Sequence, residues 1–174
     1  MTLDGETFDI NAEVVYRGKP MRVLGRMRLE GATGQVSLRY FMSDGEGAPV
    51  LLEQVAGARF ALLRPFPPSA KPPTAGNTIT VGVERYTLVG VRRLKVLELQ
   101  GQAPGAPALA QMLVSGMFEG LMGTLMRELV LGSDKQVYYL IRPVSTGDVL
   151  TAAAHAAARE AESRAAGARA EDDD

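Results

Sequence analysis

Side chains able to do acid–base, nucleophilic or metal chemistry are scarce in this chain. His155 is the only histidine, and cysteine is absent. A catalytic triad, a histidine general base and the usual zinc sites all need such side chains held in place by partners. His155 stands in an alanine-rich tract, so we interpret it as an exposed helix residue. The sequence therefore predicts no metal site, no cofactor and no thiol chemistry.

The carboxylates offer weaker candidates for catalysis. Asp44 and Glu46 lie two residues apart in a glycine-rich turn, where an aspartate commonly accepts hydrogen bonds from backbone N–H groups. Glu119 lies in an otherwise apolar segment, and a buried carboxylate is a general candidate for a functional group. An enzyme would have to use Glu119 or Asp44, and we expect a non-catalytic protein instead.

Basic side chains gather on neighbouring segments of the first third of the chain: Arg22, Arg26, Arg28 and Arg39, with Tyr40 close by. Sheet surfaces that combine basic and aromatic residues bind single-stranded nucleic acid. Alternation along a strand, however, places the first three on a face that strands usually expose. The formal net charge is −1, so we expect no nucleic-acid partner.

The elements that would position these residues are mostly strands. Short apolar segments, separated by glycine-containing turns, recur at intervals of roughly ten residues, which indicates an antiparallel sheet curled into a small barrel or sandwich. We predict a mainly β, α+β protein. Residues 1–9 form a tail, 10–66 a first β portion, 67–77 a proline-rich connector, 78–148 a second β portion, and 149–174 an alanine-rich helix with an acidic end.

The two β portions are similar to each other in sequence. YTLVG at residues 86–90 matches MRVLG at 21–25, and LLRPF at 62–66 matches LIRPV at 140–144. The second match has a larger offset, 78 residues instead of 65, as the insertion of a helix into the second portion would require. Either chance or an internal duplication explains the similarity.

Residues 106–131 are predicted to be that inserted helix, rich in methionine. Its polar positions are spaced by four, which places them on one line of an α-helix: Gln111, Ser115, Glu119, Gly123 and Arg127. Apolar side chains cover most of the remaining surface. The candidate partner-interface residues are Leu109, Met112, Leu113, Gly116, Met117, Gly120, Leu121, Met122, Leu125 and Met126.

A helix with so much apolar surface must be buried, paired or in contact with lipid. It could be a core helix packed on the sheet. It could pair with a second copy or another protein, since Gly116 and Gly120 would allow close approach. It could also lie on or span a membrane, although Glu119 would then be costly near the middle of the bilayer.

The pattern of the N-terminus differs from that of a secretory signal, and we expect a cytoplasmic protein. Five segments within residues 12–105 carry a family resemblance: VYRG at 15–18, VLG at 23–25, RYFMSDG at 39–45, VLL at 50–52 and VLELQG at 96–101. In these segments the chain resembles an uncharacterised bacterial family, a domain of unknown function whose members look like soluble β-rich proteins encoded near membrane-stress and polyamine-synthase-like proteins. The resemblance implies a soluble β-rich fold. No catalytic residues are known for the family, so none carry over.

Two functions are expected from these observations. The first is a non-catalytic binding or assembly module, which uses the methionine-rich helix to form a homo-oligomer or to bind a protein partner, with peripheral membrane contact as one setting. The alternative is a carrier that holds an apolar small molecule in a barrel or in a cleft between sheet and helix.

Overall fold

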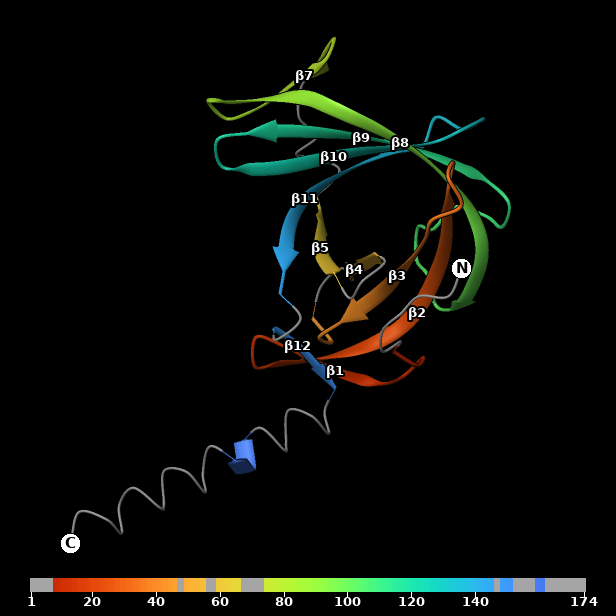
Figure 1. Ribbon diagram of the computed structural model, residues 1–174, viewed down its shortest axis with the longest axis vertical. Coiled ribbons are helices and arrows are strands. Elements are labelled where there is room, and N and C mark those ends of the chain that lie inside the picture. Colours follow the sequence, from red (N-terminus) through yellow and green to blue (C-terminus); the bar gives the residue numbers. More distant parts are fainter. Residues whose placement is uncertain are drawn as a thin grey trace, which may run out of the picture.

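The structure of the protein is a computed structural model that describes residues 8–46, 49–55, 59–66, 74–145, 148–151 and 159–161. Within these residues the chain forms twelve strands in one antiparallel sheet (Figure 1). Eight of them close into a barrel, because β2 pairs with β8 as well as with β3. Of the two predicted architectures, barrel and sandwich, the protein has the barrel.

The strands of the barrel, in order around it, are β2 (Lys19–Gly31), β3 (Val36–Ser43), β4 (Val50–Val55), β5 (Arg59–Pro65), β11 (Gln136–Val144), β10 (Gly123–Val130), β9 (Met112–Gly120) and β8 (Glu84–Gly101). Four short strands extend the sheet beyond it: β1 (Glu13–Tyr16), β12 (Val149–Thr151), β7 (Thr78–Val81) and β6 (Thr74–Ala75). The long strands β2 and β8 each carry one of these extensions on the part that lies outside their mutual pairing.

The main core fills the barrel. One cluster of buried apolar side chains draws on all eight barrel strands, so it must lie in the interior: Met27, Leu29, Phe41, Leu51, Leu63, Leu94, Val96, Leu113, Met126, Val130 and Tyr139. Two further clusters cover outer faces. The segment around Phe8 packs on β2 to β5, with its ring 5.2 Å from that of Tyr40, and β7 packs beside β8 to β11 through Ile79.

The two predicted β portions share this single sheet. Strands β1 to β5 follow one another in the sheet, and β7 to β11 repeat the same order. The halves join where equivalent strands meet, β5 against β11 and β2 against β8, both antiparallel. This arrangement is the one that two related halves would take about a two-fold axis, and the duplication stays a hypothesis.

The predicted helix over residues 106–131 is wrong. Met112–Gly120 form β9 and Gly123–Val130 form β10, joined by a turn at Leu121 and Met122. A spacing of four fits a helix, but it is also two full alternations of a strand, so the polar pattern does not distinguish them. Leucine and methionine are good helix formers, but intrinsic propensity is a weak preference, and pairing with β8 and β11 on either side overrides it.

The C-terminal helix predicted over residues 149–174 is wrong at its start, because Val149–Thr151 form β12. Residues 159–161 are helical, and the rest of that segment lies outside the described residues. The predicted tail and connector are also outside them for residues 1–7 and 67–73. Within the described part of the chain, no helix is long and apolar enough to cross a membrane.

Candidate ligand-binding site in the barrel

A pocket of about 210 Å³ opens into the barrel at the end where β8 leads into β9. Inward side chains of the barrel strands form its wall: Met27, Phe41, Leu51, Leu113, Val130, Val137 and Tyr139. Connecting segments and the end of β5 form its mouth, with Pro49, Pro65, residues 104–107 and Lys135. Apolar side chains therefore surround most of the cavity, as in ordinary small-molecule sites.

The deep end of the pocket is charged. The Arg39 side chain is fully buried, and its Nε donates to Oε2 of Glu53 at 2.8 Å. Its two terminal nitrogens donate to Oε1 and Oε2 of Glu128 at 2.8 and 2.7 Å, in a bidentate pair. Ser115 donates to Glu128 at 2.9 Å, and Arg92 donates to Glu53 at 2.8 Å. We call these five residues the charged floor, although only Arg39 and Glu128 line the pocket and the other three bond to them or to each other.

Strand register brings the charged floor together. Arg39 is directly opposite Glu53 in the β3–β4 pair, and Ser115 is directly opposite Glu128 in the β9–β10 pair. Arg39 of β3 then bonds Glu128 of β10 across the barrel, which joins the β3–β4 pair to the β9–β10 pair. Two arginines and two glutamates sum to zero charge, which meets the requirement that buried charges be paired.

Two members of the charged floor, Arg39 and Glu53, stay ionised across the neutral range. Burial alone would lower the pKa of Arg39, but the carboxylates of Glu128 and Glu53 outweigh burial and raise it. Burial alone would raise the pKa of Glu53, but Arg39 and Arg92 hold it at about 2. These groups are therefore fixed charges rather than proton carriers near neutral pH.

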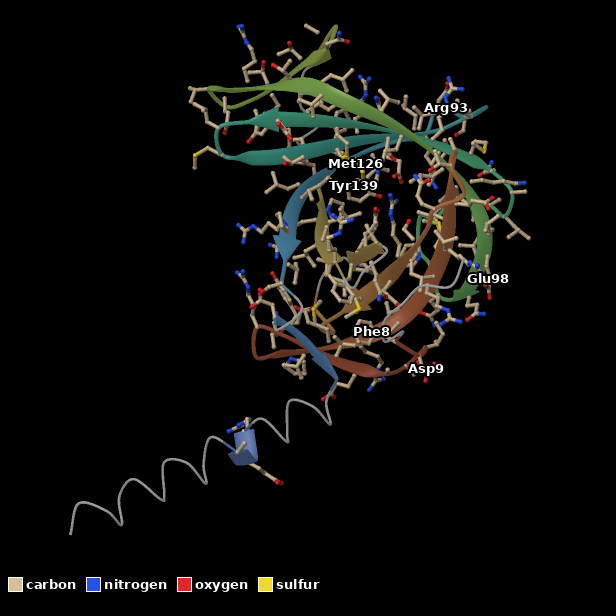
Figure 2. The ribbon with its side chains drawn as sticks, viewed as in Figure 1. Phe8, Asp9, Arg93, Glu98, Met126 and Tyr139 are labelled. Carbon is tan, nitrogen blue, oxygen red and sulfur yellow. The ribbon has the colours of Figure 1, made fainter. Side chains whose placement is uncertain are left out.

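Tyr139 supplies an uncommitted polar group in the pocket. It faces Met126 across the β10–β11 pair, and Figure 2 shows both side chains close together on the barrel wall. Burial and the nearby Glu128 carboxylate raise the pKa of Tyr139 to about 12, so its hydroxyl is neutral. That hydroxyl makes no hydrogen bond to another described residue, which leaves it able to bond a ligand.

Lys135 is the charged residue at the mouth. Its Nζ donates to the backbone oxygen of Gly105 at 3.2 Å, which joins the β10–β11 turn to the segment that leads into β9. Among the described residues no carboxylate forms an ion pair with it. The mouth therefore presents one ammonium group above an apolar wall and an electrically balanced floor.

The predicted partner-interface residues do not form one surface. Leu113, Gly116, Leu125 and Met126 are buried, whereas Met112, Met117 and Gly120 are partly buried. Leu109, Leu121 and Met122 are exposed, with Leu121 at 99%. Leu113 alone among the ten lines the pocket. The two strand faces separate residues that a helix would have placed together, and a partner interface at these positions stays a prediction.

The other candidates from the sequence lie away from the pocket. Asp44 pairs with Lys19 on the surface and also accepts a hydrogen bond from the backbone of Glu46. Glu119 is exposed near the β9–β10 turn. Over the residues with described positions, no three acidic or histidine side chains gather as metal ligands.

Sequence reasoning missed the charged floor. Arg39 entered only as part of a surface patch, and Glu53 and Glu128 were not singled out. The available signal was alternation, since each lies two residues from a buried apolar residue of its own strand, Phe41, Leu51 or Met126.

Comparison of the chain with family models, curated proteins and solved structures finds no match in any of the three.

Proposed function

We propose that the protein is a non-catalytic carrier that binds a small, largely apolar molecule inside its barrel. The observation that supports this proposal is the open pocket of about 210 Å³, with its apolar wall and the free Tyr139 hydroxyl. The wall would hold the body of the ligand by the hydrophobic effect, and the hydroxyl would orient one polar atom of the ligand.

The size of the pocket limits the ligand. An apolar cavity of roughly 150 Å³ accommodates benzene, whereas pockets for drug-sized molecules begin at about 300 Å³. At about 210 Å³ the pocket fits a single ring or a short aliphatic chain. Catalysis has little support at the charged floor, because a carboxylate with a pKa of about 2, like that of Glu53, is a poor general base at neutral pH.

Methyl NMR of the methionines tests the proposal. Met27 lines the pocket, and Met122 is exposed on the β9–β10 turn, so the two methyl groups serve as reporter and internal control. Titration with benzyl alcohol, benzamide, hexanol and hexanamide is expected to shift the Met27 signal saturably and to leave Met122 unchanged. The proposal fails if neither these compounds nor benzoate and hexanoate, acids of similar size, shift Met27.

A matched pair of variants places the binding in the pocket. Val137→Phe adds volume to the pocket wall and is expected to weaken binding at least tenfold. Val83→Phe makes the same change on a fully exposed turn and is expected to have no effect on affinity. Equal affinity in Val137→Phe and the wild-type protein would place the ligand elsewhere.

Self-association is a second candidate function, favoured by exposed apolar residues on two neighbouring turns. Leu121 and Met122 lie on the β9–β10 turn and Val83 lies on the β7–β8 turn, and a bond from the Met122 backbone to Glu84 joins them (Figure 1). A second copy would cover this surface. Light scattering is expected to show a mass that rises with concentration, and Leu121→Ser/Met122→Ser is expected to remain monomeric. A wild-type mass that does not change with concentration would exclude self-association.

A further inference from the structure

The charges around the pocket are arranged unevenly with depth. Three of the residues that line it carry charge, and two of them, Arg39 and Glu128, neutralise each other in the bidentate pair at the deep end. Lys135 at the mouth has no carboxylate partner among the described residues. Its bond to Gly105 uses one of three N–H donors, so two are available to a ligand.

This distribution of charge determines the orientation of a molecule bound in the pocket. A charged group placed at the deep end would lose its hydration, and an anion there would also face the Glu128 carboxylate. A cation at the mouth would be repelled by Lys135. An apolar body in the barrel and an anion at the mouth satisfy both constraints.

We infer that the ligand is a small amphipathic carboxylic acid, held with its apolar body between the barrel walls and its carboxylate against Lys135. This inference rests on the proposed carrier function and specifies the class of molecule carried. The neutral hydroxyl of Tyr139 can bond a polar substituent on the buried part of the acid. Lys135 and the backbone of residues 104–107 then surround the carboxylate at the surface.

Pairs of acids and amides of equal size test this inference. Benzoate and benzamide differ mainly in charge, as do hexanoate and hexanamide. Isothermal titration calorimetry is expected to show each acid binding about fivefold more tightly than its amide, with a difference that shrinks as salt screens the exposed lysine. The Met27 methyl signal is expected to respond to both members of each pair.

Two lysine variants identify the source of the preference. Lys135→Met keeps the aliphatic stem and is expected to bring the affinity for benzoate down to that for benzamide. Lys95→Met removes an exposed lysine of β8 outside the pocket and is expected to preserve the fivefold preference. Acetate carries the same charge without an apolar body, and it is expected to leave the Met27 signal unmoved.

The outcomes separate this inference from the carrier function. If acids and amides bind equally and Lys135→Met changes neither, while Val137→Phe weakens both, the protein is a carrier and the inference is wrong. If no member of the panel shifts Met27, the carrier proposal itself fails. If acetate shifts Met27 as benzoate does, the anion binds without its apolar body, which also overturns the inference.

Discussion

Replacing Arg39 with methionine removes the cation that two buried carboxylates share. Methionine is unbranched and fills much of the same space, so the main loss is the charge and its three hydrogen bonds of 2.7 to 2.8 Å. Glu53 keeps the bond from Arg92, whereas Glu128 keeps only the hydroxyl of Ser115. The substitution therefore leaves one buried carboxylate without a cation.

An uncompensated buried charge of this kind costs about 3–5 kcal/mol. Domains of ordinary stability unfold with about 5–15 kcal/mol, so Arg39→Met is expected to lose a large share of the total. With a urea dependence of about 2 kcal/mol per M, the midpoint of unfolding should fall by roughly 2 M.

Equilibrium unfolding in urea, followed by far-ultraviolet circular dichroism, measures this loss. Arg93→Met is the matched control, because Arg93 lies on the outer side of β8 (Figure 2) and is exposed. It is expected to change the free energy of unfolding by less than about 0.5 kcal/mol. The double variant Arg39→Met/Glu128→Met removes the unpaired carboxylate as well and is expected to regain most of the stability, since apolar replacement of a buried ion pair is often neutral.

Two results would refute this reasoning. If the free energy of unfolding of Arg39→Met is within about 1 kcal/mol of the wild-type value, the ion pairs of Arg39 do not contribute substantially to stability. If the double variant is no more stable than Arg39→Met, lost packing explains the effect instead of unpaired charge. The double variant also keeps the comparison informative when Arg39→Met alone does not fold.

Three further predictions concern pH and backbone space. The pKa of Glu53 falls from 4.5 to about 2 on folding, so its contribution is present above about pH 4.5 and is lost as pH falls towards 2. Roughly 2 kcal/mol should disappear between pH 6 and pH 3, and a carboxyl NMR titration midpoint near 4.5 would contradict this. The contribution of Tyr139 to stability has the opposite pH dependence, because its pKa rises from 10.0 to about 12 on folding. Stability from Tyr139 should be lost between pH 10 and 12, and spectrophotometric titration should find a phenolate that forms only near pH 12. Gly25→Ala would place a Cβ 2.3 Å from the backbone oxygen of Gln102, and urea unfolding should show a loss of about 1–3 kcal/mol, whereas Gly90→Ala meets nothing within 4 Å and should be neutral.

Local patterns were enough to predict a mainly β, antiparallel protein, because alternation and turn residues act over a few positions. They failed for the methionine-rich segment, where helix propensity and strand pairing conflict. Glycine was the useful signal there: Gly120 and Gly123 flank the β9–β10 turn, and Gly123 has φ of +146°. A glycine costs a helix on the order of 1 kcal/mol, so three within eight positions argued against one.

The site was harder to predict, because it depends on pairings between distant parts of the chain. Arg39 was grouped with Arg26 and Arg28, yet the β2–β3 register puts it opposite Met27, on the interior face. Only closure of the barrel, through β2 and β8, then surrounds that face with other strands. Propensity and spacing within one segment do not predict the β2–β3 register or the pairing of β2 with β8.

The charged floor also links the two halves of the barrel. The first half contributes Arg39 and Glu53, which bond each other, whereas the second half contributes Arg92 and Glu128, whose ion-pair partners are Glu53 and Arg39 of the first half. A second half folded alone would leave Glu128 without its bidentate cation and Arg92, whose side chain is 32% exposed, without its carboxylate. The halves therefore depend on each other through charge as well as through the shared sheet, and we expect them to unfold as one cooperative unit.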